Sequence, residues 1–436
     1  MQVEHLKRYF FILGRNPELS LAELFSVFPS ARWQDEVCSG GVLLLESETN
    51  PAPFMKRLGG TVKIGEVIGQ WESGARDAIE THIVEAMSQT GESEEGKRYF
   101  GLSAYRVASS MKILSVQDLR HLGISIKKQL QEAGVRSRLV TSKEAALSSV
   151  IVKTNHLLNR GAEFCIFFDQ EKTFLGKTLD VQEFGDASAR DFGRPVHEMS
   201  VGMLPVQLAK ILINLSATPL GAVLFDPFCG FGTVLAEAAM MGYTRLIGSD
   251  LEQKMAEATR KNFDWLASRY QLTAASRGLK LFISPAETIS KQVTAHSVDV
   301  IVTEPYLGPV NQGRGQVAGV IRDLVKLYTK AFQEFAKILK PGGKVVFVFP
   351  AFKQSDKLDK TSEGVLSQIK KVGFQSIPLL PQGSTPRYSL PATHSIIYSR
   401  PSQKVLREIF VFQFNDTETD AIQPHNRPVL DKKVKS

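Results

Sequence analysis

Hydrophobic positions follow one pattern before about residue 200 and another after it. In the first part, short apolar runs predict strands at 9–13, 41–45, 60–69, 99–107, 148–153 and 162–169. Within this part, Val116, Leu119, Leu122, Ile126 and Leu130 recur at steps of three and four, which predicts an amphipathic helix. We therefore expect an α+β structure for this half.

The first helix is expected to begin with a capping box. Ser20 and Glu23 follow the turn Gly14-Arg15-Asn16-Pro17. A Ser and a Glu three residues apart can satisfy the first free amides of a helix with their side chains.

From residue 203 onward, apolar strands alternate with helices, which is typical of a parallel sheet covered on both faces. The expected strands are 222–225, 246–248, 281–283, 298–302 and 345–349. A helix is predicted over 321–339, and Pro341-Gly342-Gly343 ends it. The segments 395–398 and 409–414 are expected to add antiparallel strands at an edge. The second half is thus predicted to be a doubly wound α/β domain.

A chain of 436 residues usually forms about two to four domains. We divide it into domains at 1–60, 61–178 and 201–415, with a linker at 179–200 and a polar tail at 416–436. No apolar run reaches the roughly 18 residues that cross a bilayer, and no signal peptide is evident, so a cytoplasmic location is expected. The three cysteines are far apart, so neither disulfides nor a metal site is expected.

Lys and Arg number 53 against 45 Asp and Glu, a net charge of +8. Much of the basic character of the first half falls on Arg106, Lys112, Arg120, Lys127, Lys128, Arg136, Arg138 and Lys143. Such a density can neutralise several phosphates of a folded RNA. A solvated helix face is the alternative, and charge alone leaves both open.

The second half carries unusual residues just after its strands, where open α/β sheets bind ligands. Gly230 and Gly232 let the chain turn tightly after the first strand, and Asp250 follows the second strand at a spacing suited to ribose hydroxyls. A dinucleotide fingerprint would need a third glycine where Leu235 stands. Asp226 repels phosphate but suits a cation. These residues therefore favour S-adenosylmethionine over NAD.

Glu304 and Pro305 follow the fourth strand. An exocyclic amine of a nucleobase is a poor nucleophile, because its lone pair is delocalised into the ring. The Glu304 side chain and the Pro305 carbonyl can accept its two hydrogens and hold its nitrogen in line with the transferable methyl. A plain turn that ends the strand is the alternative.

Together, the segments 226–233 and 304–308 resemble the cofactor and catalytic loops of the THUMP-domain tRNA guanine-10 N2-methyltransferases. Segments 11–15, 20–24, 175–178, 190–195 and 201–205 are also similar to that family, and the likeness extends over about 9–412. The resemblance implies a ferredoxin-like domain and an RNA-binding THUMP domain, followed by a Rossmann-like methyltransferase domain. It also implies that the basic part of the first half grips the acceptor end of tRNA.

The resemblance also implies roles for individual residues. The cofactor site would consist of Met203, Pro205, Asp226, Phe228, Gly230, Gly232, Thr233, Asp250 and Ala286. Glu304 and Pro305 would be catalytic, with Tyr306 stacking on the target base. RNA would contact Arg106, Lys112, Lys127, Lys128, Arg136, Arg138 and, beside the target base, Arg314.

The chain departs from the family pattern at two places. The catalytic loop reads Glu304-Pro305-Tyr306-Leu307 where the family has Asp-Pro-Pro-Tyr, so either Tyr306 or Leu307 takes the aromatic position. Glu304 is one methylene longer than Asp, and a misplacement of about 1 Å can cost on the order of a hundredfold in rate. Pro285 stands where the family usually has an aspartate that faces the adenine amine, so either cofactor affinity is lower or Glu287 serves instead.

We therefore predict an S-adenosylmethionine-dependent methyltransferase that acts on the N2 amine of a tRNA guanosine, at position 10. An inactive RNA-binding protein with the same fold and a DNA amino methyltransferase are the alternatives. A monomer with no membrane association is expected. The number of methyl groups and the need for a small partner subunit stay open.

Overall fold

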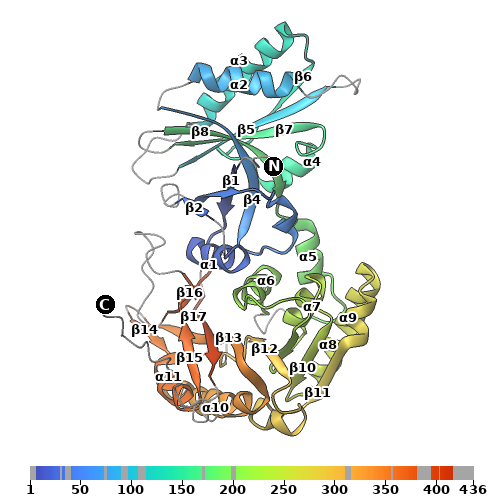
Figure 1. Ribbon diagram of the computed structural model, residues 1–436, viewed down its shortest axis with the longest axis vertical. Helices are drawn as coiled ribbons and strands as arrows, with labels where there is room; N and C mark the ends of the chain where they lie inside the picture. The colour runs from blue at the N-terminus through green and yellow to red at the C-terminus, as the bar shows by residue number, and fades with distance from the viewer. Residues whose placement is uncertain are drawn as a thin grey trace, which may run out of the picture.

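The computed structural model arranges the chain as two bodies, one above the other (Figure 1). It describes residues 6–29, 32–34, 41–72, 76–89, 97–106, 114–168, 172–197, 203–309, 316–354, 357–380, 394–401 and 403–415. Each body is built on one large sheet, which within these described ranges has eight strands in the upper body and nine in the lower. None of the helices within the described ranges is long and apolar enough to cross a bilayer.

The upper sheet has the strand order β2-β3-β1-β4-β8-β7-β5-β6. Its strands are β1 (Lys7–Leu13), β2 (Arg32–Gln34), β3 (Val42–Ser47), β4 (Thr61–Glu72), β5 (Arg98–Arg106), β6 (Ser137–Val140), β7 (Gly161–Phe168) and β8 (Lys172–Val181). Its helices are α1 (Pro17–Val27), η2 (Ala52–Lys56), α2 (Arg76–Ser88), α3 (Val116–Glu132) and α4 (Ser149–Thr154). Strand β4 pairs with both β1 and β8, so the sheet is continuous across the domain boundary expected at residue 60. The domain boundaries themselves stay predictions.

Two local predictions for this half were wrong. Helix α1 begins at Pro17, and Ser20 lies inside it, where its hydroxyl donates to the carbonyls of Asn16 and Gly60. No capping box forms, because the proline takes the first helical position. The expected strand at 148–153 is helix α4, whose first turn is capped by the Ser148 hydroxyl accepting from the Ile151 amide at 3.3 Å.

The lower sheet has the strand order β11-β10-β9-β12-β13-β17-β15, with β14 paired to β13 and β16 paired to β17. Its strands are β9 (Val223–Asp226), β10 (Arg245–Asp250), β11 (Leu279–Ile283), β12 (Val298–Thr303), β13 (Leu339–Gln354), β14 (Lys357–Lys360), β15 (Phe374–Ile377), β16 (Ile396–Tyr398) and β17 (Val405–Phe414). Its helices are α6 (Val206–Leu215), α7 (Thr233–Met240), α8 (Gln253–Tyr270), α9 (Thr273–Gly278), η4 (Ala286–Lys291), α10 (Val317–Ile338) and α11 (Ser362–Lys371). Strand β17 is antiparallel as expected, but it lies between β13 and β15 and not at the edge.

Successive residues of the central strands belong to cores on opposite faces of the lower sheet. Leu224 packs in the core that contains α6, α7 and α8, whereas Phe225 packs in the core that contains η4, α10 and α11. Both faces are therefore covered, which explains why these strands read as continuous apolar runs.

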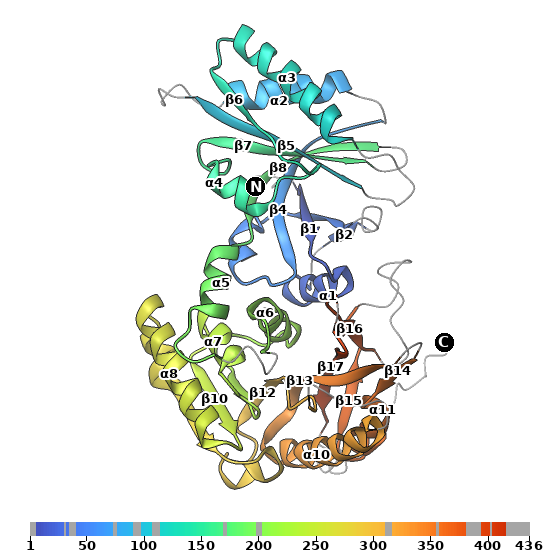
Figure 2. The same ribbon diagram turned by 180° about the vertical axis from the view of Figure 1, so that it is seen from behind.

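The segment interpreted as a linker contains helix α5 (Phe184–Phe192), which is fixed to the lower body. Its Arg190 forms an ion pair with Glu237 of α7 at 2.7 Å, and both side chains are at most 4% exposed. The two bodies also meet directly, since α6 lies between α1 and the lower sheet (Figure 2). Buried Glu23 of α1 accepts from the Asn214 side chain of α6 at 2.8 Å. These contacts hold the two bodies together.

Candidate active site

The candidate site lies where the order of the lower sheet reverses. The chain runs outward from β9 through β10 to β11 and then returns to the other side of β9 as β12. Ligands of open α/β sheets bind at such switch points, beyond the carboxyl ends of the strands. Asp226 ends β9, Asp250 ends β10, and Glu304 directly follows β12. The structure thus brings three predicted site residues to one edge.

The glycine loop between β9 and α7 is held in a conformation that suits glycine. Gly230 has a φ of +51° and Gly232 a φ of +81°, and a Cβ on Gly232 would lie 2.9 Å from Thr259 Cγ2. The Gly230 amide donates to Asp250 Oδ2 at 2.9 Å, and its carbonyl accepts from the Thr259 hydroxyl at 2.7 Å. The loop is therefore fixed against the end of β10 and against α8.

Asp250 has the hydrogen-bonding capacity that a ribose requires. Its Oδ2 accepts from the Gly230 amide, and its Oδ1 accepts from the Glu252 amide at 3.0 Å. A carboxylate oxygen has about two acceptor positions, so each oxygen keeps one for a ribose hydroxyl. Burial raises the pKa of Asp250, and hydrogen bonding from the backbone amides of Glu252, Gly230 and Leu251 partly offsets this rise.

Asp226 is a buried carboxyl group, 2% exposed. Its Oδ1 accepts from the Thr303 hydroxyl at 2.6 Å and from the Phe228 amide at 3.2 Å, and no ion pair among the described residues includes it. Burial raises its pKa to about 7, and the negative charges of Asp250 and Glu304 act in the same direction. A buried acid surrounded by other acids fits a ligand that brings a positive charge. The site therefore fits the sulfonium of S-adenosylmethionine.

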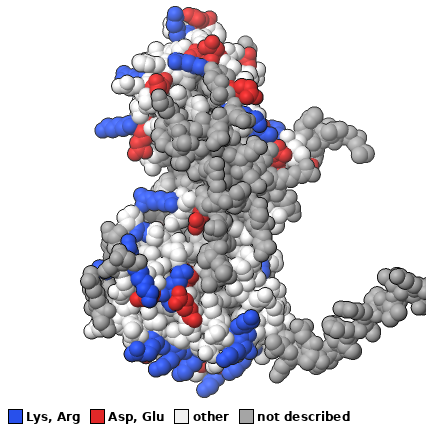
Figure 3. Space-filling view, turned by 90° about the vertical axis from the view of Figure 1, so that its left-hand side faces the viewer, with Lys and Arg blue, Asp and Glu red and all other residues white. Residues whose placement is uncertain are grey.

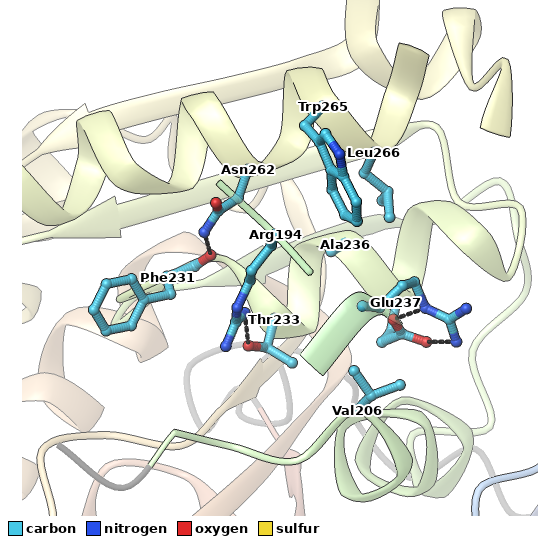
Figure 4. Close-up of a pocket in the computed structure, with 10 residues that line it drawn as sticks. Arg194, Val206, Phe231, Thr233, Ala236, Glu237, Asn262, Trp265 and Leu266 are labelled. Carbon is cyan, nitrogen blue, oxygen red and sulfur yellow. Dashed lines mark hydrogen bonds and ion pairs between the residues drawn. The ribbon is translucent and has the colours of Figure 1, made fainter. Parts of the chain in front are cut away.

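Arg194 contacts the cofactor loop at Phe231 and Thr233 (Figure 4). The sequence did not predict this role. Its guanidinium donates to the Thr233 hydroxyl and to Met203 Sδ, each at 2.8 Å, and lies 5.8 Å from the centre of the Phe231 ring. The cavity beside it has a volume of about 10 Å³, which holds one water at most. This cavity is therefore not the cofactor site. The only available signal was that Arg194 belongs to a segment resembling the family.

The segment before α6 is fixed to the same region. Pro205 caps α6, and the Val206 amide in its first turn donates to Asp191 Oδ1 at 3.1 Å. Helix η4, which follows β11, begins with the buried Ala286. The next residue, Glu287, forms an ion pair with Lys330 at 3.4 Å. Glu287, the expected substitute for the missing family aspartate, therefore already has a partner.

Glu304 forms an ion pair with Arg407 of β17 that the sequence did not predict. The guanidinium donates from Nε to Oε2 and from Nη2 to Oε1, the latter at 3.0 Å. The side chains of Glu304 and Arg407 are only 11% and 6% exposed. The two residues are 103 positions apart, so no local pattern could have indicated their contact.

Of the two candidates for the residue that stacks on the base, Tyr306 and Leu307, only Tyr306 is exposed. The Tyr306 side chain is 58% exposed, while its carbonyl accepts from the Tyr328 hydroxyl of α10 at 2.6 Å. Leu307 instead packs against the hydrophobic core. The backbone is therefore anchored, and only Tyr306 presents a free face on which a base can stack.

The predicted RNA-binding residues of the upper body lie on its surface. Lys127 and Lys128 are exposed on α3, and Arg136 and Arg138 are exposed at β6. Acidic and basic side chains are interspersed on the upper body in Figure 3, and Lys128 pairs with Glu132 at 3.8 Å. Arg106 ends β5, but its side chain, like Lys112 and Arg314, lies outside the described residues. Their RNA contacts stay predictions.

Comparison with known proteins agrees with this geometry. The family model described as the RMKL-like methyltransferase domain of UPF0020 matches residues 196–374. A protein of Methanothermococcus thermolithotrophicus named "Probable tRNA (guanine(10)-N2)-dimethyltransferase" is 33% identical over 142 residues, which cover 32% of this chain and 78% of that protein. The chain belongs to the tRNA guanine-N2 methyltransferase family. The resemblance inferred from the motifs is thereby confirmed.

Other relatives of this guanine-N2 methyltransferase chain match over less of their length. The tRNA (guanine(10)-N2)-dimethyltransferase of Methanocaldococcus jannaschii is 29% identical over 163 residues, 37% of this chain and only 41% of that protein. The crystal structure of TrmN from Thermus thermophilus superposes with a TM-score of 0.52 and 17% identity, over 93% of this chain and 99% of that one. It confirms the α+β half followed by a Rossmann-like α/β domain. The expected enzyme class and, with it, the cofactor S-adenosylmethionine are likewise confirmed.

Proposed function

We propose that this enzyme methylates the N2 amine of a guanosine in tRNA, at position 10. The observation that carries the proposal is the arrangement of acids at the switch point. Buried Asp226 has no cationic partner among the described residues, and Glu304 follows the neighbouring strand within electrostatic reach of it. The names of the relatives support the choice of nucleotide.

In this mechanism the cofactor supplies an electrophilic methyl group on a positively charged sulfur. Asp226 would stabilise that positive charge, and Asp250 would accept hydrogen bonds from the ribose hydroxyls. Tyr306 stacks on the guanine. The Pro305 carbonyl and a Glu304 oxygen each accept a hydrogen bond from one N–H of the amine. Positive charge develops on the nitrogen as it forms its bond to the methyl carbon, and the nitrogen becomes neutral again when one of these protons passes to the Glu304 carboxylate.

Arg407 makes the longer Glu304 side chain compatible with this role. Each Glu304 oxygen accepts one hydrogen bond from the guanidinium and keeps a lone pair for the amine. A bidentate pair with a planar fork fixes the position of the carboxylate more firmly than a single contact. The ion pair thus removes the freedom that the additional methylene would otherwise introduce.

The test uses two tRNA transcripts that differ at one atom group. Inosine lacks the exocyclic amine of guanosine, so a transcript with inosine at position 10 retains the shape of the substrate but not its nucleophile. We expect transfer of a labelled methyl group to the guanosine transcript and none to the inosine transcript. Equal labelling of both would refute the proposed position.

The same assay separates the alternative functions. The Glu304–Arg407 ion pair is the observation that favours an inactive RNA-binding protein, because it occupies part of the carboxylate that would contact the amine. Such a protein would shift tRNA in a gel without transferring label. Label on duplex DNA and not on tRNA would indicate a DNA amino methyltransferase.

A further inference from the structure

A basic groove lies at the junction of the two bodies, outside the site described above. Its volume is about 790 Å³, and it is lined by Arg15, Lys353, Lys357 and Arg400 together with neutral residues. None of the described residues that line it is acidic. The Lys and Arg side chains come from three elements: the loop between β1 and α1, the β13–β14 hairpin, and the turn between β16 and β17.

Three of these cations have no ion-pair partner within the described part of the chain. Lys357 pairs with Asp359 at 2.9 Å, whereas no ion pair involves Arg15, Lys353 or Arg400. The Arg400 guanidinium is held in place because its Nε donates to the hydroxyl of Tyr398 at 2.6 Å. On the side of the molecule shown in Figure 3, Lys and Arg outnumber Asp and Glu on the lower body. Asp191 acts electrostatically on Arg400 from outside the groove lining, but no acid is among the described residues that line the groove. Cations that are not paired with acids favour a polyanionic ligand.

The groove and the candidate active site are linked through strand β17. Leu406 lines the groove, and the next residue of β17, Arg407, holds Glu304. Arg407 lies opposite Pro350 of β13, and Lys353 lies three residues further along that strand, a rise of about 10 Å.

We propose that the basic groove binds phosphates of the RNA strand that carries the target guanosine. The proposal rests on the proposed function and adds to it a contact surface in the lower body. Because Arg15 belongs to the upper body and Lys353 and Arg400 to the lower, one RNA strand would bridge both. Phosphate contacts of this kind set the register of the strand, while the catalytic loop recognises the base.

The test compares two full-length variants that lose the same number of cations. The groove variant carries Arg15→Gln, Lys353→Gln and Arg400→Gln. The control variant carries three substitutions on exposed residues of α8 and β11, away from the groove: Lys261→Gln, Arg269→Gln and Lys280→Gln. Binding of a fluorescent unmodified tRNA transcript is measured by anisotropy from low to high salt, and cofactor binding by calorimetry.

We expect the groove variant to bind tRNA about tenfold more weakly or worse at low salt, and the control to remain within about twofold. The plot of log affinity against log salt should become shallower by about 2 for the groove variant, since each lost phosphate contact contributes about 0.7–0.9. Cofactor affinity should be unchanged in both variants.

Equal affinities and equal salt slopes for the two variants would overturn the groove proposal alone, provided that the wild type methylates tRNA. If the wild type neither binds nor methylates tRNA, the proposed function fails, and the groove proposal fails with it. An equally large loss of duplex DNA binding in the groove variant, with tRNA binding intact, would also overturn it.

Discussion

Replacement of Asp226 by Asn tests whether the buried carboxylate in the candidate site lowers the stability of the folded protein. The Asp226 carboxyl is buried, and its pKa is raised from 3.8 to about 7. Asn keeps an oxygen that can accept from the Thr303 hydroxyl and the Phe228 amide, so the substitution removes the charge and retains both hydrogen bonds.

The sign of the effect follows from the direction of the pKa shift. Because the folded state binds the proton more tightly than the unfolded state, Asp226 lowers stability as pH rises from 3.8 to about 7. One pKa unit corresponds to about 1.4 kcal/mol, so the wild type should lose about 2–3 kcal/mol between pH 5 and pH 8 through this group alone. Asp226→Asn does not titrate and should escape that loss.

The assay is urea unfolding at pH 5 and pH 8, followed by the fluorescence of Trp265 in α8. Both proteins carry Trp33→Phe and Trp71→Phe, so that only the lower body is reported. The difference in free energy of unfolding between Asp226→Asn and the wild type should shift in favour of the variant by about 2–3 kcal/mol from pH 5 to pH 8. The same variant should bind S-adenosylmethionine more weakly at pH 8, since the cation has lost its counter-charge.

Asp299→Asn is the matched control. The pKa of Asp299 is lowered by its hydrogen bonds from Lys340 and from the Val223 amide, despite partial burial. Asp299 is therefore ionised in both states at pH 5 and pH 8, and its substitution should destabilise the fold equally at the two pH values. If Asp226→Asn showed the same pH-independent behaviour, the reasoning about the buried acid would be refuted.

Three further substitutions test the remaining parts of the site. Asp250→Ala should weaken S-adenosylmethionine binding by about tenfold or more in calorimetry, because two charge-assisted hydrogen bonds are lost, and should leave tRNA binding intact. An unchanged cofactor affinity would contradict the ribose contact. Arg407→Lys keeps the charge but not the bidentate fork, so kcat should fall about tenfold to a hundredfold while KM for both substrates stays within about twofold. Full turnover would show that catalysis does not need the bidentate ion pair to position Glu304. Gly232→Ala should lower the free energy of unfolding by about 1–2 kcal/mol in urea titrations, because of its positive φ and the contact with Thr259; Thr259→Ala in the same chain should recover the part due to the contact.

Local patterns in the sequence were sufficient for most strands of the lower sheet and for the glycine loop. The run that became β12 was recognised because both of its faces are apolar, and the loop because two glycines follow a strand. The same local reasoning failed at Ser20 and Ser148, since a capping motif, or a six-residue segment with three apolar residues, fits more than one backbone conformation. Pro17 decided the first case, and the Ser148 cap decided the second.

The sequence by itself determined the chemistry of the strand ends, because Asp226, Asp250 and Glu304 each follow a recognisable strand and parallel strands present their carboxyl ends at one edge. Only the tertiary structure decided which groups surround these acids. Strand β17 enters the sheet beside β13, and this pairing brings Arg407 to Glu304 and places Arg400 near Arg15 of the upper body. Such contacts depend on the order of strands in the sheet, and neither periodicity nor spacing along one segment contains that information.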